Sequence, residues 1–527
     1  MSDELSPSIP KTAVLTVPRQ RAWLWQPNLI VFVSSACIMV LELVAGRIIA
    51  PHVGSSLYTW TSVIGVVLAG ISLGNYFGGW LADRWASLRV LGSIYVLAAL
   101  ASVAILWVDQ INRVTPEGWP IVAEVVAMTT ALFFVPCTIL GMISPVVVKL
   151  TVSDLAKTGS TVGKIYAAGA LGSIVGTFLT GFVLIAWYGT HTIVWGVALL
   201  LLTMGLAFIL AGRWLTIPIA IVLLAMLSYL AADRNWLRTP CVRETNYYCI
   251  KINTDANEGE SVRLLVLDHL VHSFVDLNDP THIVYGYEKM YAEAAQYQAA
   301  RRGGVAPPLR AAMIGGGGYT FPRYMEAIYP TSEMDVIEID PGVTQVAFDL
   351  LALRADTRLK TFNEDARMYF AQKPTTSYDL VFGDAFNHFS VPYHLTTKEF
   401  NDDVRAWLAP GGMYVINIID GPYGEFIRAY VNTLRQTFRY VYFSPGGDGW
   451  RQTLRTTFVI IATDTELDVA ALNNFDGGDD DVLLARTLAT EEDTKRLLTE
   501  APPVLLTDQY APVDNMLASV FREELRK

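Results

Sequence analysis

Long apolar runs fill residues 27–233, with only short polar stretches between them. Each run is long enough to cross a bilayer as a helix, which takes about 20 residues. We therefore predict a polar N-terminal tail (1–26) and a seven-helix transmembrane domain (27–233) whose partner is the lipid bilayer. The expected spans are 28–48, 57–81, 89–108, 120–148, 162–187, 191–211 and 215–232.

The pattern changes after residue 239, where apolar positions occur in short runs rich in β-branched and aromatic residues. Such runs are typical of strands. Tyr247–Ile252, Val262–Leu267 and Val271–Val275 predict an antiparallel meander. We expect a small β-domain over residues 239–283.

From residue 284 onward, helix-like and strand-like segments alternate, which is typical of a parallel, doubly wound sheet. The predicted fold class is a multi-pass α-helical membrane domain plus an α/β Rossmann-like domain (284–527) that the small β-meander precedes. The expected helices are Val284–Ala300, Pro341–Leu353 and Thr397–Leu408, and the expected strands are Ala311–Ile314, Val336–Ile339, Leu359–Asn363, Asp379–Phe382 and Met413–Ile418.

Composition agrees with a membrane protein. The chain is 52% hydrophobic and 17% charged, which is too apolar for an ordinary soluble protein of 527 residues. Its net charge of −11 gives no reason to expect nucleic acid as a partner. The polar start lacks the apolar core of a cleavable signal peptide.

Basic residues in the loops predict an orientation, because Lys and Arg are enriched on the cytoplasmic side. The bias places the N-terminus in the cytoplasm and, after an odd number of spans, the globular half outside. Lys11, Arg19, Arg21, Arg84, Arg89, Lys149, Lys157, Lys164 and Arg213 lie on the N-terminal side, against Arg47, Arg113, Arg234, Arg238 and Arg243 on the other.

Two cysteines, Cys241 and Cys249, follow the last span. A disulfide between them would suit an oxidising compartment, and two unpaired thiols fit the spacing equally well. Within the spans, Glu42, Arg47 and Glu124 are costly in lipid. The sequence leaves open whether they form a structural ion pair or serve transport or gating.

A glycine-rich turn follows the expected strand Ala311–Ile314, and Glu338 lies at the end of the next strand. In a Rossmann-type unit such a turn lets the backbone approach a nucleotide, and an acid about 20 residues later binds the ribose. The pattern predicts a nucleoside site. Its turn residues are Gly315, Gly316, Gly317 and Gly318.

Two further acids, Asp365 and Asp384, also follow strands, so they fall at the same edge of a parallel sheet. Each acid before Asp384 has a structural alternative. Glu338 or Asp340 can cap the helix that opens at Pro341, and Asp365 can cap the helix after it. Asp384 precedes an aromatic loop, which favours a functional role.

The loop after Asp384 also contains His388, and His394 follows it; both are acid/base candidates or simply solvated residues. No paired Cys or His motif predicts a metal site.

Several motifs together resemble the spermidine synthase (aminopropyltransferase) family, in its bacterial branch fused to a membrane domain. The resemblance covers Glu244–Asn417, with a further match at Leu506–Met516. The motifs are ETNYYCI, RLLVLDHLVH, MIGGGG, DVIEIDP, EDARMYF, YDLVFGDAF and LTTKEF followed by LAPGG, then LTDQYAPVDNM.

The resemblance implies a methyltransferase-like domain, often a homodimer, that uses a sulfonium nucleoside. It implies no prosthetic group, with S-adenosylmethionine or its decarboxylated form as substrate. By that analogy Glu338 holds the ribose, Asp365 and Ala366 face the adenine, and Asp384 stands at the reacting centre. The location implied is the bacterial inner membrane, with the charge bias favouring a periplasmic globular half.

The departures from the family pattern concern the amine-binding positions. Gly318 stands where the family carries Asp, and Asn387 where it carries a second catalytic Asp. Tyr248 and His272 stand where the family carries Gln. Each lost charged hydrogen bond costs about 1.5–3 kcal/mol, so polyamine binding should be weakened.

The leading hypothesis from the sequence is therefore a lyase that cleaves the Cγ–S bond of S-adenosylmethionine, releasing methylthioadenosine and homoserine lactone. Gly318 would not repel the donor carboxylate, and amides of the turn would accept it. The alternatives are aminopropyl transfer from the decarboxylated donor, and a transporter or sensor that binds the nucleoside without turnover. We expect Asp384 to be catalytic and Tyr248, His272, Tyr285, Tyr287 and Asn387 to complete the substrate site.

Overall fold

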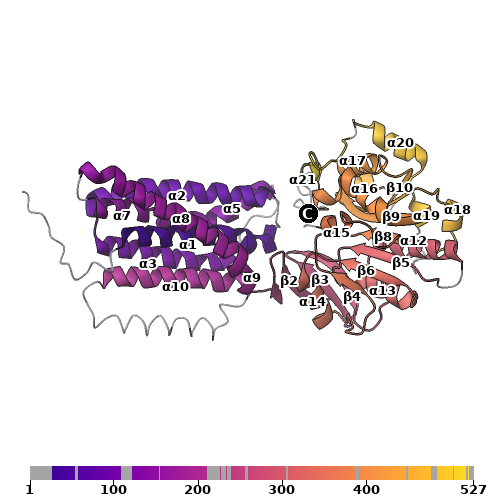
Figure 1. Cartoon of the computed structure of the whole chain (residues 1–527), viewed down its shortest axis with the longest axis horizontal. Helices are drawn as coiled ribbons and strands as arrows, with labels where there is room; N and C mark the ends of the chain where they lie inside the picture. The colour runs from indigo at the N-terminus through magenta and orange to yellow at the C-terminus, as the bar shows by residue number, and fades with distance from the viewer. Residues whose placement is uncertain are drawn as a thin grey trace, which may run out of the picture.

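The protein consists of a helical half and an α/β half that lie end to end along its long axis (Figure 1). The structure is a computed structural model. It describes residues 26–53, 57–108, 121–152, 155–210, 226, 229, 233, 239–255, 259–303, 307–386, 391–446, 449–475, 484–502, 504–517 and 520.

Six helices of the described residues are long and apolar enough to cross a membrane. They match the first six predicted spans, and the seventh, 215–232, lies largely outside the described residues. The six run over Pro27–Val53 (α1), Tyr58–Trp85 (within α2, Leu57–Trp85), Leu88–Trp107 (beginning with α3, Leu88–Ala104), Val122–Thr151 (α5 to α7), Thr158–Trp187 (α8, Thr158–Leu179, to α9, Ile185–Trp187) and Thr190–Ile209 (α10).

Glycines let these helices pack closely. A Cβ on Gly74 of α2 would lie 2.1 Å from the carbonyl oxygen of Thr138 in α6 (Val135–Gly141). A Cβ on Gly172 of α8 would lie 2.1 Å from the carbonyl oxygen of Phe32 in α1. The small side chain is therefore required for both contacts, because backbone approaches backbone there.

A four-stranded antiparallel sheet follows, as the sequence predicts. Its strands are β1 (Arg243–Glu244), β2 (Cys249–Thr254), β3 (Val262–Leu267) and β4 (Leu270–Asp276), in that order. A disulfide joins Cys241 to Cys249, which decides the alternative that the sequence left open. It ties the segment before β1 to the first residue of β2.

The second sheet has seven strands in the order β10-β11-β9-β8-β5-β6-β7. The strands β5 to β9 pair in parallel, as predicted, but β11 pairs antiparallel with β9 and β10 antiparallel with β11. The sheet is therefore mixed. Its strands are β5 (Arg310–Ile314), β6 (Glu333–Ile337), β7 (Lys360–Phe362), β8 (Tyr378–Gly383), β9 (Leu408–Asp420), β10 (Tyr440–Pro445) and β11 (Thr456–Thr463).

Helices cover both faces of this sheet. The residues of one buried cluster come from α12 (Gly286–Arg302), α13 (Thr320–Ile328) and α14 (Pro341–Leu350), together with the small sheet. The opposite cluster contains residues of α15 (Ala366–Phe370), α16 (Lys398–Trp407) and α17 (Glu425–Leu434). Burial on both faces explains why β5 and β8 are almost continuously apolar.

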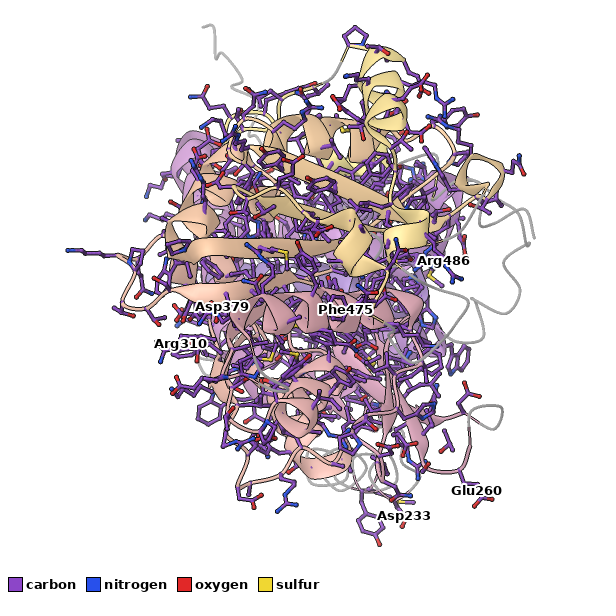
Figure 2. The ribbon with its side chains drawn as sticks, turned by 90° about the vertical axis from the view of Figure 1, so that its right-hand side faces the viewer. Asp233, Glu260, Arg310, Asp379, Phe475 and Arg486 are labelled. Atoms are coloured by element: carbon purple, nitrogen blue, oxygen red, sulfur yellow. A yellow bond between two sulfur atoms is a disulfide. The ribbon has the colours of Figure 1, made fainter. Side chains whose placement is uncertain are left out.

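Acidic side chains have different surroundings at the amino and carboxyl ends of the sheet's strands. Asp379 lies near the amino end of β8 and is only 1% exposed. It accepts a hydrogen bond from the Arg310 amide (2.9 Å) and pairs with Arg302; Figure 2 shows Arg310 beside it. This acid is structural, whereas the acids at the carboxyl ends surround cavities.

The helical half meets the α/β half at the small sheet. Arg47, near the end of α1, donates to the backbone carbonyls of Thr245 and Tyr247. The carboxylate of Glu244 accepts from the amide of Thr190 (2.8 Å), which opens α10. Arg47 therefore connects the two halves through backbone hydrogen bonds. The sequence analysis considered an ion pair and a transport or gating role for this residue, and not this contact.

Candidate active site

The chain reverses direction across the second sheet between β5 and β8. From β5 it continues outward to β6 and β7, and then returns to the other side of β5 to form β8. Such a switch point leaves a crevice at the carboxyl ends of the strands, where ligands bind in α/β folds. The predicted acids and the glycine turn lie there.

The glycine turn fits only because two of its residues adopt positive φ angles, +92° at Gly315 and +49° at Gly317. A Cβ on Gly315 would lie 2.5 Å from the carbonyl oxygen of Asp384. The turn therefore packs directly on the backbone that follows β8, which brings β5 and Asp384 together.

Glu338 fastens this turn from the neighbouring strand. Its Oε2 accepts from the amides of Gly316 (2.7 Å) and Gly317 (3.3 Å), and its Oε1 accepts from the amide of Asp340 (2.9 Å). Burial raises the pKa of Glu338, and these amides oppose the shift. Asp340, not Glu338, caps α14 by accepting from the Gly342 amide.

Glu338 lines a cavity together with Gly315, Gly317, Asp365 and Ala366, which we call the Glu338 cavity. Asp365 caps α15, which confirms the structural alternative, and it also lines this cavity, so its role toward a nucleoside stays a prediction. Its carboxylate lies 3.2 Å from Nε2 of His394, and this contact lowers the pKa of Asp365.

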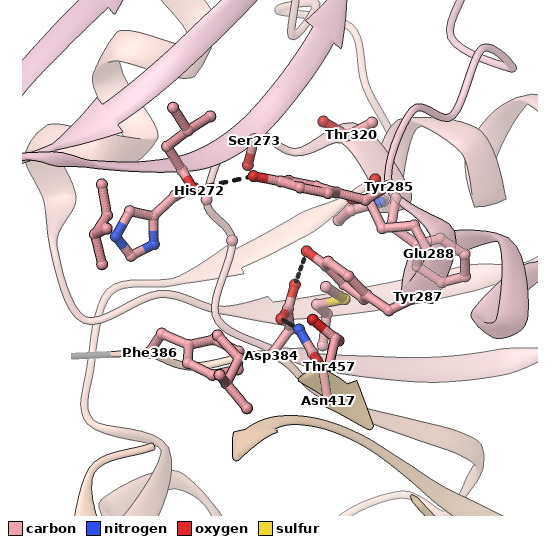
Figure 3. A pocket seen from close by; sticks show the side chains of 18 of the residues that line it. His272, Ser273, Tyr285, Tyr287, Glu288, Thr320, Asp384, Phe386, Asn417 and Thr457 are labelled. Atoms are coloured by element: carbon pink, nitrogen blue, oxygen red, sulfur yellow. Dashed lines mark hydrogen bonds between the residues drawn. The ribbon is translucent and has the colours of Figure 1, made fainter. Parts of the chain in front are cut away.

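Asp384 lies at the boundary between the Glu338 cavity and a second cavity, which Glu288, Tyr287 and Asn417 help to line and which we call the Glu288 cavity. Its Oδ1 accepts from Nδ2 of Asn417 (2.9 Å), and its Oδ2 accepts from the hydroxyl of Tyr287 (3.0 Å) (Figure 3). Burial raises the pKa of Asp384 to about 7, although both hydrogen bonds lower it. The group can therefore exchange a proton near neutral pH.

Glu288, which the sequence analysis missed, is a second acid in the cavity named after it. It is 3% exposed, and its Oε2 has no hydrogen-bond partner among the described residues. Burial and the nearby charge of Asp384 raise the pKa of Glu288 well above its usual value. The sequence signal that could have identified Glu288 is its position as a charged residue in the tyrosine-rich helix that begins at Gly286.

Aromatic and imidazole rings close the space between the two cavities. The ring centroids of Tyr285 and Tyr287 lie 5.3 Å apart, and the Tyr285 hydroxyl donates to the carbonyl of Val271 (3.0 Å). His272 lines both cavities, and burial lowers its pKa to about 4, so the ring is neutral at pH 7. The hydroxyl of Tyr248 donates to the carbonyl of Phe386 (3.4 Å).

Gly318 lies beneath β4 rather than in open space. A Cβ there would lie 2.5 Å from Cγ2 of Val275 and 2.8 Å from Cβ of Ser273. Its amide donates to Oγ of Ser273 (2.9 Å), while the Gly315 amide donates to the carbonyl of Ile337 (2.8 Å). All four amides of the turn thus have partners within the protein, which contradicts the expectation that they would accept a substrate carboxylate.

Asn387 and His388 lie outside the described residues. In the part of the chain that the structure describes, no group of three His, Cys, Asp or Glu side chains is placed to hold a metal ion.

Comparisons with known proteins point in one direction. No family model matches the chain. A polyamine aminopropyltransferase of Vibrio vulnificus is 36% identical over 112 residues, which are 21% of this chain and 38% of that relative. A polyamine aminopropyltransferase 2 of Streptomyces coelicolor is 24% identical over 438 residues, covering 76% of this chain and 74% of that relative.

The second alignment is longer than the α/β half, so it extends into the apolar helices. Among solved structures, a probable spermidine synthase from Corynebacterium glutamicum has a TM-score of 0.44 and 22% identity, covering 51% of this chain and 95% of that chain. These homologues confirm the resemblance that the motifs indicate: the chain is similar to polyamine aminopropyltransferases, and its match to the Vibrio vulnificus relative spans 38% of that relative's length.

Proposed function

We propose that this chain is an enzyme that transfers the aminopropyl group of decarboxylated S-adenosylmethionine to an amine and releases methylthioadenosine. The observation that carries the proposal is the pair of acids, Asp384 and Glu288, that line one cavity beside the nucleoside-type cavity. Buried carboxyl groups next to tyrosine faces suit a substrate that brings an ammonium group.

The Glu338 cavity would hold the nucleoside of the donor. Glu338, already fixed by the turn amides, would accept from the ribose hydroxyls, and Asp365 and Ala366 would face the adenine. His272, neutral at pH 7, would lie near the sulfonium without repelling it. Tyr248 and Phe386 line the same cavity and offer aromatic faces to the cation.

An acceptor that enters as its ammonium form first loses one proton to solvent, because only a neutral amine can react. Its nitrogen lone pair then attacks the carbon next to sulfur. A C–N bond forms, the C–S bond breaks, and its electron pair remains on sulfur as the neutral thioether of methylthioadenosine. The nitrogen then sheds a proton, which Asp384 takes and returns to solvent. A pKa of about 7 suits this step, while Tyr287 and Asn417 hold the carboxylate in place.

The hypothesis of an S-adenosylmethionine lyase is the second candidate. Its support is Gly318, because the closeness of Val275 and Ser273 keeps any side chain, and so any acid, from that position. The structure offers less for it than the sequence did, since the turn amides are engaged. The family carries acids at the positions of Gly318 and Asn387, and this chain does not. Glu288 supplies an acid to the cavity in their place.

We further propose that the apolar helices span the bacterial inner membrane. The division into a tail (1–26), a membrane domain (27–233), a small β-domain (239–283) and a Rossmann-like domain (284–527) belongs to this proposal. The observation in favour is the six apolar helices of the described residues.

The experiment uses the purified full chain in lipid nanodiscs. Methylthioadenosine is measured after incubation with decarboxylated S-adenosylmethionine, with and without a mixture of primary amines, and with S-adenosylmethionine alone. We expect product only when the decarboxylated donor and an amine are both present. Product from S-adenosylmethionine alone would establish the lyase instead, and nucleoside binding without product would favour a transporter or sensor.

A further inference from the structure

A guanidinium group lies where the distal end of an acceptor would sit. Arg455 immediately precedes β11, is exposed, and lines the Glu288 cavity. It also lines a third cavity of about 350 Å³, which we call the Trp450 cavity. The positive charge of Arg455 acts on His272, which lines the Glu338 and Glu288 cavities: after burial and His269, it contributes to lowering the pKa of that imidazole.

The Trp450 cavity continues the site away from the nucleoside. It shares Tyr285, Tyr287, Arg455 and Thr457 with the Glu288 cavity, and it shares no lining residue with the Glu338 cavity. The three cavities therefore follow one another, with Asp384 at the first boundary and Arg455 at the second. A donor in the Glu338 cavity leaves the Trp450 cavity to the acceptor.

The charges along this path change sign. Asp384 and Glu288 line the middle cavity, where Oε2 of Glu288 is buried and has no hydrogen-bond partner among the described residues. Arg455 is the only charged residue among the described residues that line the Trp450 cavity. The rest of that cavity is apolar, aromatic or hydroxyl-bearing, with Trp450, Met290 and Thr453 among its residues.

A diamine or polyamine fits this arrangement poorly. Its first ammonium would meet two acids, but its second would lie beside a guanidinium, where like charges repel. A carboxylate at that place would instead form the bidentate, charge-assisted pair for which arginine is suited.

We propose that the acceptor is an amino acid: an amine that also carries a carboxylate at its far end. This inference rests on the proposed aminopropyl transfer and names its acceptor class. The amine enters the Glu288 cavity, and the carboxylate is held by Arg455. The products are an N-(3-aminopropyl) amino acid and methylthioadenosine, with the displaced proton passing through Asp384 as before.

The test supplies decarboxylated S-adenosylmethionine and compares three acceptors of equal length: a straight-chain ω-amino acid, the corresponding diamine and the corresponding monoamine, in a series of chain lengths. Methylthioadenosine formation gives kcat/KM for each. We expect the best ω-amino acid to exceed its diamine by at least tenfold, with the monoamine between them. The variant Arg455→Glu should invert this order, because it exchanges the sign of the charge that meets the far end.

Arg405→Gln is the matched control, since Arg405 is exposed, pairs with Asp464 and lines none of the three cavities. It should leave the order of acceptors unchanged. Methylthioadenosine formed fastest with the diamine, or an order that Arg455→Glu does not change, would overturn the amino-acid acceptor and leave aminopropyl transfer standing. No methylthioadenosine with any acceptor would overturn the proposed function and this inference together.

Discussion

Opposing forces set the protonation of Asp384. Hydrogen bonds from Tyr287 and Asn417 stabilise its anion, while burial destabilises it, and burial outweighs them because the pKa is raised to about 7. Below that pH the carboxyl group already carries the proton that a base must accept. Its catalytic usefulness should therefore grow with pH.

We expect kcat/KM to rise about tenfold per pH unit below pH 7 and to level off above it, since only ionised Asp384 takes a proton from the amine. Asp384→Asn should lower kcat by about 10²–10⁴-fold while methylthioadenosine still binds. Steady-state kinetics across pH and calorimetric titration give the two readouts. Asp356→Asn, on an exposed acid paired with Arg354, is the control that should change neither. An active Asp384→Asn enzyme would show that Asp384 is no base.

Substitution of Glu288 should weaken binding of the acceptor amine. Glu288→Gln removes a carboxyl group that can ionise against the incoming ammonium, so KM for the amine should rise about 10–100-fold, following about 1.5–3 kcal/mol per charged hydrogen bond. KM for the sulfonium donor should change far less, because Glu288 does not line the Glu338 cavity. Equal changes in both constants would contradict a role in holding the acceptor.

The same residue affects stability with a definite sign. The folded-state pKa of Glu288 is raised, so its contribution is fully present below its ordinary pKa of 4.5 and is lost as pH rises toward the raised value. Wild-type protein should thus lose more of its melting temperature between pH 5 and pH 8 than Glu288→Gln. Calorimetry in nanodiscs measures both slopes, and parallel slopes would contradict the raised pKa.

At the scale of elements, the turn after β5 and the hairpin of β3 and β4 form one unit. The Gly318 amide is bound by Ser273, and Val275 covers the glycine from above. The small sheet therefore packs on the turn of the proposed nucleoside site, although β4 and β5 belong to separate sheets.

Gly318→Ala tests this contact. The added methyl would lie 2.5 Å from Val275, so β4 must move, and we expect a loss of about 1–3 kcal/mol in the free energy of unfolding. Methylthioadenosine affinity should fall as well, because β4 carries His272. Gly79→Ala makes the same change where nothing lies within 4 Å of the added atom, and should be nearly neutral. Unchanged stability of Gly318→Ala would contradict the close packing.

At the scale of the whole molecule, a short chain of contacts links the helical half to the Glu338 cavity. Arg47 of α1 holds the carbonyl of Thr245, and the Thr245 hydroxyl donates to Asp340. Asp340 in turn donates its amide to Glu338 (2.9 Å). The carboxyl ends of the strands, where the cavities lie, are therefore the ends connected to the helical half.

Arg47→Gln should weaken this link. Loss of the guanidinium releases the segment before β2, and we expect methylthioadenosine affinity to fall about threefold to tenfold, measured by calorimetric titration. Arg89→Gln, an exposed arginine at the start of α3, is the matched control. Equal affinity for wild type and Arg47→Gln would show that the halves are energetically independent.

The compartment of the α/β half is a further prediction at this scale. The loop charges and the Cys241–Cys249 disulfide both favour the outside of the cell. A C-terminal alkaline phosphatase fusion should then be active, and a fluorescent-protein fusion dark. The opposite pair of results would place the site in the cytoplasm. The homodimer, which only the resemblance implies, stays a prediction.

The sequence by itself determined the kinds of elements and their order. Apolar run lengths predict the first six membrane-type helices, and β3 is predicted residue for residue. Strand ends marked by glycines or acids predicted which residues line the cavities, because parallel strands bring their carboxyl ends to one side of the sheet. The strands β10 and β11 were not predicted. They pair antiparallel at the end of the sheet, and the alternation of helices and strands earlier in the chain does not indicate such pairing.

Tertiary structure alone decided which residues share a cavity. Glu288 and Arg455 are far apart in sequence from Asp384, and only the packing of α12 and β11 brings them to its cavity. The sequence likewise predicts that the turn amides are free to bind a substrate carboxylate, whereas in the structure they donate to partners such as Glu338 and Ser273. Periodicity reports which face of an element is buried, whereas partners and charges across a cavity depend on contacts between distant segments.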